Sequence, residues 1–388
     1  MQLQIVRDGS GKIMSITMPR PSNFHAHFRW EDDGLIDAVT PENIRHFKYV
    51  LAMPNNGPGD GKLIRSIEDA HRVYHRIMDI RARHRITSFT RPLMTLYLTS
   101  DITPQVIERM AHSGFVFAVK SYPVHRAGQH GTTNSGHGVP FDECEETIRA
   151  MEKWGVPLLI HAEDVNDENG DEIPHKDREA HCVTHRLWKF REKHPELRIC
   201  LEHASTREAI EFVKADPSGR TVMTVTPQHL LFTAEDFERY SWRNHLRCMP
   251  YVKTEADRQA LLDFVTSGDP RCIAGDDTAP HRSMNKNVEF EKAMCGCWLP
   301  HSIALYTLAF MQRNAINDSF VKFMSFNGPK WWDLTPPAND DTITIVAETE
   351  KDIPAPTPLP KVNDVIIPLG WSESPDRLKI GYAVAMAA

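Results

Sequence analysis

The sequence predicts an α/β fold, a (β/α)₈ barrel of the TIM type, and three observations lead to it. Eight short apolar segments alternate with helical patterns through most of the 388 residues, as in a barrel of parallel strands covered by helices. Most of these segments end in a polar or charged residue, where barrel enzymes carry their functional groups. No GxGxxG or GxxxxGK[ST] motif follows any of them, which disfavours a doubly wound open sheet.

The expected strands are short and apolar throughout, because helices cover both faces of a parallel sheet. They are expected at Asn23–Phe28, Tyr49–Met53, Thr90–Leu98, Gly114–Lys120, Pro157–His161, Arg198–His203, Thr221–Val225 and Cys272–Gly275. Helical patterns between and after them include Ile64–His84, Pro104–His112, Asp142–Trp154, Ala180–Lys193, Ala256–Ser267 and Pro300–Arg313. The alternation of the two predicts the parallel order of the strands.

Both ends of the chain depart from this alternation. Residues 1–20 indicate a short β-hairpin that turns at Asp8–Gly11, and residues 336–388 are rich in proline with a few β-like runs. We expect the second segment to be a C-terminal extension packed on the barrel. Residues 1–388 would then form a single domain with a core of about residues 20–335.

Composition excludes several classes of protein. The net charge is −7 and the pI about 6.3, so the chain lacks the basic surface of a nucleic-acid-binding protein. No apolar run is long enough to cross a membrane, and the first residues do not form a signal peptide. The seven scattered cysteines show no zinc-binding pattern and suit a reducing compartment. We expect a cytoplasmic enzyme with no nucleic-acid or membrane partner.

Several strand ends carry residues that bind metals. His25 and His27 lie two apart on a strand and so point to the same face, the spacing that lets two imidazoles hold one ion. His161 and His203 end two later strands, and Asp277 follows the last. Each residue alone is more often structural, but their joint occurrence in barrel order is specific for a metal site.

Lys120 ends another apolar strand, although burying a lone ammonium is costly. A carbamate formed with CO₂ would explain this position, because it is an anionic bridge between two cations. Nitrogen and carboxylate ligands favour Zn²⁺, with Co²⁺ or Mn²⁺ as substitutes. We therefore expect two Zn²⁺ per subunit, bridged by N6-carboxylysine at Lys120 and by a hydroxide that is nucleophilic at neutral pH. Asp277 can also accept a proton, so it is the candidate catalytic residue.

Nine sequence segments carry a resemblance to a known family. They are NFHAHFR (23–29), AMPN (52–55), VKSYP (119–123), TTNSGHGV (132–139), LLIHAED (158–164), LEHAST (201–206), VTPQHLLF (225–232), AGDDTAPH (274–281) and FNGP (326–329). In this order they resemble the amidohydrolase superfamily, and within it the class II, short bacterial dihydroorotases. The resemblance implies reversible interconversion of L-dihydroorotate and N-carbamoyl-L-aspartate in pyrimidine biosynthesis, by a homodimer.

The resemblance also implies how the metals are shared. His25, His27 and Asp277 would hold the more buried ion, and His161 and His203 the more exposed one, with carboxylated Lys120 between them. Asp277 would carry the proton from the hydroxide to the ring nitrogen. Glu163 and His229 also match the family, and we expect them to support the metal ligands by hydrogen bonds.

The substrate carries a carboxylate, and cationic or amide donors beyond the strand ends fit it. Arg29 offers a planar fork of donors, and Asn55 and His281 add further donors. The amide edge of the ring is expected to pair with backbone near Met249 and near Cys295. The sequence departs from the family around Cys295, because EFEKAMCGCWLP (289–300) replaces the family's Cys-rich stretch.

Thr132 and Thr133 match the mobile loop that closes over the substrate in this family, where hydroxyl donors would bind the carboxylate. The preceding segment, residues 122–131, is longer than in the family's common form and adds His125, Arg126 and His130. The insertion at 124–131 either alters loop closure and substrate range or is a longer solvated loop.

Two other functions compete with this interpretation. A hydantoinase or dihydropyrimidinase shares the metal ligands, but it cleaves neutral rings and needs no carboxylate clamp such as Arg29, Asn55 and His281. An inert barrel acting as a binding partner would be expected to lose ligands, and every ligand position here is filled. A metal-free α/β binding protein lacks support, because the chain has no phosphate-binding loop.

Overall fold

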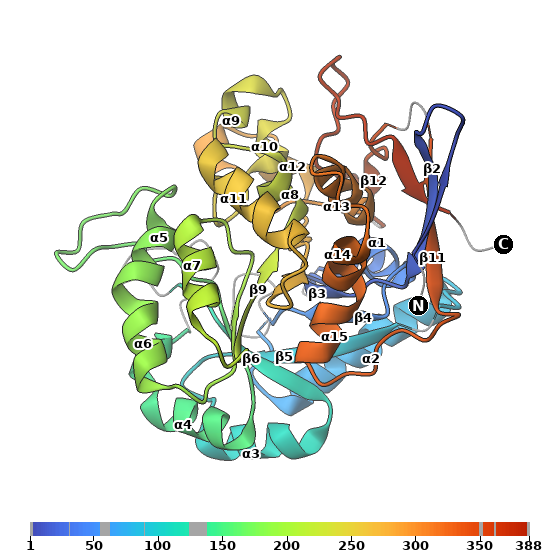
Figure 1. Cartoon of the computed structure of the whole chain (residues 1–388). Helices are drawn as coiled ribbons and strands as arrows, with labels where there is room; N and C mark the ends of the chain where they lie inside the picture. The colour runs from blue at the N-terminus through green and yellow to red at the C-terminus, as the bar shows by residue number, and fades with distance from the viewer. Residues whose placement is uncertain are drawn as a thin grey trace.

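A sheet of eight parallel strands forms the centre of the computed structural model, in the order β10-β9-β8-β7-β6-β5-β4-β3 (Figure 1). A parallel bridge between Ala26 and Thr278, just beyond the two outermost strands, brings the sheet edges together. The chain therefore forms a (β/α)₈ barrel, as predicted. The structure describes residues 3–30, 32–54, 63–88, 90–123, 138–348, 352–360 and 362–385.

All eight predicted strands are present; β9 has the predicted bounds, and the other seven are one to three residues shorter than expected. They are β3 (Asn23–Ala26), β4 (Tyr49–Ala52), β5 (Arg91–Tyr97), β6 (Val116–Ser121), β7 (Leu158–Ile160), β8 (Ile199–Leu201), β9 (Thr221–Val225) and β10 (Cys272–Ala274). Because several strands stop one or two residues early, the polar residues after them lie on loops at the carboxyl end of the barrel. This is the end where barrel enzymes bind substrate.

Helices cover the outside of the barrel. The helices are α1 (Asp33–Arg45), α2 (Ile67–Arg83), α3 (Pro104–Ser113), α4 (Glu145–Trp154), α5 (Arg178–Cys182), α6 (Trp188–Lys193), α7 (Arg207–Ala215), α8 (Pro227–Leu231), α9 (Asp236–Arg239), α10 (Arg243–Leu246), α11 (Glu255–Thr266), α12 (Ser283–Lys286), α13 (Ser302–Met311), α14 (Asp318–Val321) and α15 (Asn327–Trp331). Two π turns, Val183–Leu187 and Lys322–Phe326, join α5 to α6 and α14 to α15. The single helix expected at Ala180–Lys193 is thus interrupted by a wider turn.

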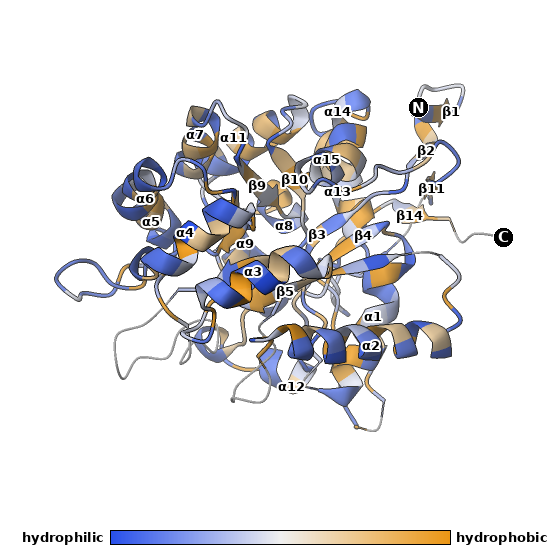
Figure 2. Cartoon of the chain, turned by 90° about the horizontal axis from the view of Figure 1, so that it is seen from below, coloured by the Kyte–Doolittle hydropathy of each residue, from blue (hydrophilic) through white to orange (hydrophobic). Residues whose placement is uncertain are grey.

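Local sequence explains the helix positions, as α2 illustrates. Its N-terminus is a capping box in which Ser66 and Asp69 each bond the other's backbone. Its buried residues, Ala70, Val73, Ile77 and Ile80, recur every three or four positions and so line one face of the helix. Figure 2 shows hydrophilic and hydrophobic residues alternating along α2 accordingly.

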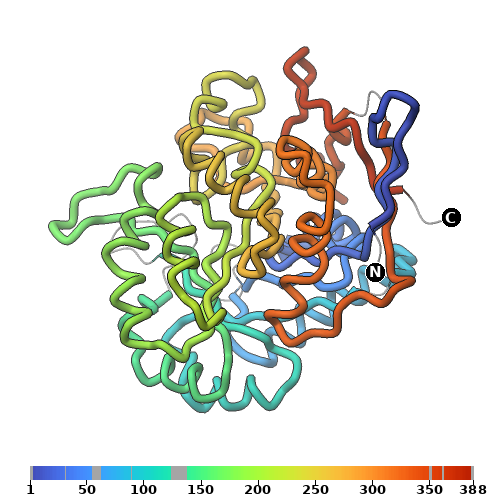
Figure 3. Tube along the Cα trace, in the orientation of Figure 1, coloured from blue at the N-terminus to red at the C-terminus, as the bar shows by residue number. Residues whose placement is uncertain are grey.

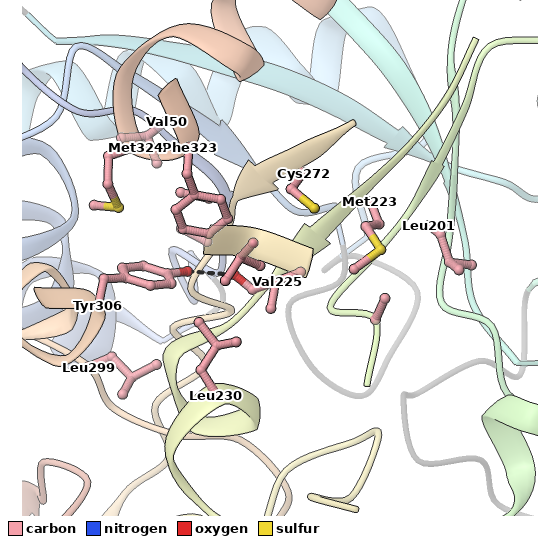
Figure 4. Packing of buried hydrophobic residues seen from close by; sticks show 14 of the residues in the cluster. Val50, Leu201, Met223, Val225, Leu230, Cys272, Leu299, Tyr306, Phe323 and Met324 are labelled. Carbon is pink, nitrogen blue, oxygen red and sulfur yellow. Dashed lines mark hydrogen bonds between the residues drawn. The ribbon is translucent and has the colours of Figure 1, made fainter. Parts of the chain in front are cut away.

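Alternate strand residues fill two separate cores. One core lies within the barrel and contains Leu51, Leu93, Leu159 and Ile273, whereas their strand neighbours pack against the helices. Figure 4 shows part of the outer core, where the Tyr306 hydroxyl of α13 donates to the Val225 carbonyl at the end of β9 (2.7 Å). The barrel interior is therefore packed solid below the end that carries the polar residues.

A second sheet unites the two terminal segments. The strands β1 (Gln4–Arg7) and β2 (Ile13–Pro19) form the predicted hairpin, and β11 (Thr342–Ala347) pairs with β2 on one side and β14 (Tyr382–Val384) on the other, all antiparallel. Two further short strands, β12 (Thr357–Pro358) and β13 (Val365–Ile366), pair with each other. Figure 3 shows the blue N-terminal hairpin running beside the red C-terminal segment.

Gly328 of α15 lies against the barrel floor, and we expect Gly328→Ala to destabilise the fold. A Cβ here would come within 2.0 Å of the Phe24 ring, and Phe24 is buried and stacked on Trp332 (centroids 5.9 Å apart). We expect the free energy of unfolding to fall by about 1–3 kcal/mol, measured by urea denaturation. Gly9→Ala is the control, because a Cβ there meets nothing within 4 Å. Equal losses in both variants would contradict the argument.

None of the described helices is both long and apolar enough to cross a membrane.

Candidate metal centre and active site

His25, His27 and Asp277 meet at the carboxyl end of the barrel. The Nε2 atoms of His25 and His27 lie 3.1 and 3.3 Å from Asp277 Oδ1, and one ligand atom from each of the three lies within 4.8 Å of the others. All three residues are buried. The structure thus brings together residues that are about 250 positions apart in the chain, as the sequence predicts for ligands of one ion.

Lys120 lies beside His25, and the carboxylate of Glu202 contacts both side chains. Its Nζ is 3.2 Å from Glu202 Oε2, and the same oxygen contacts His25 Nδ1. The side chains of Lys120, Glu202 and His25 are almost completely inaccessible to solvent. Glu202 therefore fixes the position of Lys120 and orients the imidazole of His25 so that Nε2 faces Asp277.

His161 and His203 form the other half of the cluster. Their rings pack edge to face with centroids 4.5 Å apart, and the ring of His203 is 5.0 Å from that of His25. His161 Nε2 lies 2.6 Å from Glu163 Oε2, which leaves Nδ1 as the nitrogen that can bind an ion. The expected support of a ligand histidine by Glu163 is present as a contact in the structure.

The backbone is strained at three of these positions. Arg29, His203 and Asp277 have positive φ angles of 52°, 42° and 51°, a region that residues other than glycine seldom adopt. Backbone and hydroxyl hydrogen bonds hold two of them, because the Asp277 amide donates to the His25 carbonyl (3.0 Å) and the His203 amide to Thr224 Oγ1 (2.7 Å). Such strain concentrates at functional sites, where it aims side chains.

The ionisation of His27, His203 and Asp277 suits metal binding. Burial lowers the pKa of His27 to about 4, and burial together with the neighbouring His161 lowers the pKa of His203 well below its ordinary value. Burial would raise the pKa of Asp277, but His25 and His27 hold it well below the usual range. His25 differs, because burial alone would lower its pKa but Glu202 and Asp277 raise it. Neutral imidazoles at His27 and His203 beside an ionised Asp277 are the form in which these side chains bind metal ions.

The donors present fit a metal ion. His203 Nδ1 is buried and has no hydrogen-bond partner among the described residues, and such orphaned groups are rare unless something is bound to them. Four imidazoles, one carboxylate and a buried lysine converge here, a donor set of nitrogen and oxygen that zinc prefers. The residues therefore fit the zinc centre that the resemblance implies.

A cationic group lies next to the cluster. Arg29 Nε donates to the Pro280 carbonyl (3.0 Å), and its Nη2 is 3.2 Å from His281 Nε2. The same His281 nitrogen is 2.8 Å from the Cys295 carbonyl, which can only accept. Nε2 thus lies between a guanidinium that can only donate and a carbonyl that can only accept, and it can satisfy one of them at a time. Burial and the Arg29 charge hold the pKa of His281 well below its ordinary value. A permanent positive charge thus lies beside a neutral ring.

Hydrogen bonds and close packing fix the backbone at Met249 and Cys295, the two positions expected to pair with the amide edge of the substrate. His229 bridges Thr226 Oγ1 (2.7 Å) and the Pro250 carbonyl (2.9 Å) through its two ring nitrogens, so it holds the backbone next to buried Met249. Gly296 follows Cys295 at a φ of 137°, and a Cβ there would come within 2.2 Å of the Ala279 carbonyl. Asn55, Thr132, Thr133 and the insertion at 124–131 lie outside the described residues.

Solved structures with similar folds are amidohydrolases. The structure resembles a dihydroorotase crystallised with 5-fluoroorotic acid from Saccharomyces cerevisiae, with a TM-score of 0.80 and 23% identity over 96% of this chain and 98% of that one. The dihydroorotase of Campylobacter jejuni gives 0.78 and 23% over 100% and 99%. An L-hydantoinase from Arthrobacter aurescens gives 0.66 and 15% over 91% and 84%. These structures agree with the amidohydrolase barrel.

Sequence relatives decide the family. No protein-family model matches the chain. A curated dihydroorotase from a Picosynechococcus strain is 37% identical over 359 residues, 92% of this chain and 96% of the relative, and one from Halorhodospira halophila is 36% identical over 365 residues, 93% and 97%. The chain belongs to the dihydroorotase family. It is accordingly a cyclic amidohydrolase, and the family predicted from the sequence is confirmed.

Within this dihydroorotase barrel, Glu202 contacts two of the proposed ligands, although its place in the sequence predicted no role for it. The carboxylate precedes His203 in the segment LEHAST and reaches across to Lys120 and His25. Burial alone would raise its pKa, but Lys120 and His25 hold the pKa of Glu202 at about 2. A buried lysine requires a compensating anion. The position of Lys120 at the end of an apolar strand therefore indicates that a carboxylate lies nearby, but it does not indicate which one.

A pocket borders the cluster at His161. The residues that line it include Tyr122, Phe141, His161, Glu163 and Arg186. The Tyr122 ring lies 5.1 Å from Lys120 Nζ and 6.3 Å from the ring of His161. A small polar molecule in this pocket would meet the cluster at His161.

Proposed function

We propose that the protein catalyses the reversible hydrolysis of L-dihydroorotate to N-carbamoyl-L-aspartate, the dihydroorotase step of pyrimidine biosynthesis. The observation that carries the proposal is the arrangement of six potential metal ligands with Arg29 and His281 beside them at one end of the barrel. The ligands supply the chemistry common to cyclic amidohydrolases. The guanidinium supplies the charge that a carboxylate-bearing ring needs and a neutral ring does not.

Two zinc ions are the cofactors we propose. His25, His27 and Asp277 would hold one ion, and His161 and His203 the other, with Lys120 as its carbamate between them. When bound, the ions polarise the scissile carbonyl and supply a water that ionises at neutral pH. Glu202 and Glu163 contact His25 and His161 on the nitrogen that does not face the centre, and such contacts fix the tautomer of a ligand histidine.

Asp277 performs the proton transfer in this proposal. Water adds its oxygen to the carbonyl carbon of the ring amide, and Asp277 takes the proton that the water gives up. As the C–N bond breaks, Asp277 returns the proton to the ring nitrogen, which leaves as the NH₂ of the carbamoyl group. The backbone at Asp277 is held by the His25 carbonyl, so its carboxylate is fixed before substrate arrives.

We expect Arg29→Lys to weaken substrate binding more than turnover. A guanidinium binds a carboxylate through two parallel N–H donors, which an ammonium cannot reproduce. Loss of one charge-assisted hydrogen bond costs roughly 1.5–3 kcal/mol, so KM for dihydroorotate should rise about tenfold to a hundredfold with a small change in kcat. Steady-state kinetics measure both constants.

Arg282→Lys is the matched control for this variant. Arg282 is close in sequence to His281, but its guanidinium pairs with Asp32 (2.6 Å) and takes no part in the proposed clamp. KM should therefore stay near the wild-type value. An unchanged KM in Arg29→Lys, or an equal rise in Arg282→Lys, would remove Arg29 from the clamp.

We also propose that the enzyme works in the cytoplasm as a homodimer. All seven cysteines are free thiols, in keeping with a reducing compartment. Sedimentation equilibrium of the purified protein tests the oligomeric state, and a mass of one chain across the micromolar range would contradict the dimer.

The test of function is a dihydroorotate hydrolysis assay with metal analysis of the same sample. Dihydrouracil, the same ring without the carboxylate, is run in parallel. At least two zinc ions per chain with turnover of dihydroorotate alone support the proposal. Preferred turnover of dihydrouracil would indicate a hydantoinase-type enzyme, and neither metal nor turnover after addition of zinc and bicarbonate would indicate an inert barrel.

A further inference from the structure

A second group of potential metal ligands lies outside the barrel. Glu168, His181 and His185 each offer one ligand atom, and these three atoms lie within 4.8 Å of one another. Among the described residues, this group and the one formed by His25, His27 and Asp277 are the two sets of three with such geometry. We call Glu168, His181 and His185 the outer triad. It belongs to the connection from β7 into α5, which projects at the left of Figure 1.

Hydrogen bonds set the tautomers of both histidines. His181 Nδ1 is 2.9 Å from Asp164 Oδ2, and His185 Nδ1 is 3.0 Å from the His181 carbonyl oxygen. A carboxylate and a carbonyl only accept hydrogen bonds, so both Nδ1 atoms carry the proton. The lone pair of each ring is then at Nε2, which is the arrangement usual for metal-binding histidines.

The two rings are placed for a shared ligand. His181 is the penultimate residue of α5 and His185 lies four residues later in the π turn, a spacing that puts both side chains on one face. The rings are nearly parallel, with centroids 4.1 Å apart and planes 18° apart. A π turn is an uncommon feature that is frequent at functional sites.

Asp164, which contacts the His181 ring, is held in place by other side chains. Asp164 is buried, and its other oxygen, Oδ1, accepts from Arg186 Nη1 (2.6 Å). Arg186 is in turn held by both oxygens of Asp142 (2.9 and 2.5 Å). The imidazole of His181 is thus oriented by a chain of contacts that does not involve Glu168 or His185.

The third ligand is brought by a loop with its own hydrogen bonds. An antiparallel bridge joins Asn166 to Glu172, and Asp167 Oδ1 accepts from the amides of Asn169 and Asp171. Glu168 lies on this loop and is exposed to solvent. Its carboxylate can therefore reach the two histidines while the loop keeps its shape.

We propose that the outer triad binds one Zn²⁺, or a similar late first-row divalent ion, through His181 Nε2, His185 Nε2 and a Glu168 oxygen. Two neutral imidazoles and a carboxylate are ligands that zinc takes, and the exposed side of the site leaves room for water in the remaining position. The bound ion ties the 166–172 loop to α5. This site is separate from the proposed catalytic centre and does not depend on the proposed function.

Metal counting on the fully loaded enzyme tests the site. The protein is first saturated with zinc at the barrel centre and then dialysed against buffered free Zn²⁺, and zinc per chain is measured by mass spectrometry. Wild type should hold one zinc more than His185→Ala. His185 is exposed, and its one hydrogen bond to the described residues is to a backbone carbonyl, so this variant should fold. Glu168→Gln should weaken the added site at least about tenfold.

His75→Ala is the matched control. His71 and His75 also lie four apart on a helix, but their rings are 6.2 Å apart and His71 stacks on Phe115 (4.0 Å). This variant should keep the additional zinc. Added zinc should also raise the Tm of wild type and of His75→Ala but not that of His185→Ala. Retention of the additional zinc by His185→Ala, or its loss from His75→Ala, would overturn the proposal. Because the readouts are a zinc count and a Tm, failure of the dihydroorotase assay would leave them interpretable.

Discussion

Replacing Lys120 by alanine is expected to abolish turnover and remove at least one zinc from the barrel centre. The side chain is completely buried and is bound by Glu202 alongside His25, so alanine removes the proposed bridge between the two ions. Activity should fall at least about a thousandfold, roughly 4 kcal/mol of transition-state stabilisation. Kinetics and zinc content measured on one preparation check the result.

Lys286→Ala separates this effect from the general cost of losing a buried lysine. Lys286 is also buried, but its Nζ donates to the backbone carbonyls of Met294 (2.8 Å) and Gly296 (2.9 Å). Its loss should lower stability and leave two zinc ions at the centre. If Lys120→Ala kept both ions and full turnover, the bridging role would be wrong.

Asp277→Asn is expected to lower kcat by at least about a thousandfold. The amide keeps the shape of the side chain, but it is a poorer ligand and cannot take up the proton of the attacking water. The contacts to His25 and His27 at 3.1 and 3.3 Å also lose the negative charge that offsets a cation. Single-turnover kinetics and zinc content together measure the chemical step and the ligand loss.

The neighbouring Asp276 provides the control. It is equally buried, but its carboxylate accepts from the Thr278 amide (2.9 Å), and burial raises its pKa to about 6. Asp276→Asn keeps that acceptor, so kcat should stay within about tenfold of wild type with both ions present. A loss equal to that of Asp277→Asn would show that the effect belongs to the loop and not to proton transfer.

The barrel could be predicted from sequence because its strands are buried on both faces. Runs such as PLLIH and RICLEH combine apolar content with a polar end, a pattern typical of strands in a parallel sheet that carries a functional site. Helix α1 is not among the helical patterns named from the sequence. It contains Pro41, and an internal proline ordinarily indicates a helix end. Here the helix continues through it, with Leu35, Val39 and Ile44 buried beneath.

The proposed metal ligands could be located in the sequence, whereas the contacts around them could not. Each proposed ligand is a residue type with its own chemistry at a strand end, so the strand ends and their order in the barrel locate it. Glu202 acts across the barrel on Lys120 and His25, and the distance between them depends on strand order and closure. The contact of Arg29 with His281 (3.2 Å) likewise joins the first and last strand ends. Sequence spacing does not report such contacts.

The sheet shared by the two terminal segments can form only late in synthesis, because it needs strands from both ends of the chain. Thr17 and Thr344, whose hydroxyls lie 2.9 Å apart, are separated by 327 residues. A ribosome makes β2 early and β11 late, so the inner edge of the hairpin stays unpaired for most of synthesis, and closing so long a loop is slow. Unpaired edges favour aggregation. Nascent chains that stop before β11 should therefore be the species that most need a chaperone.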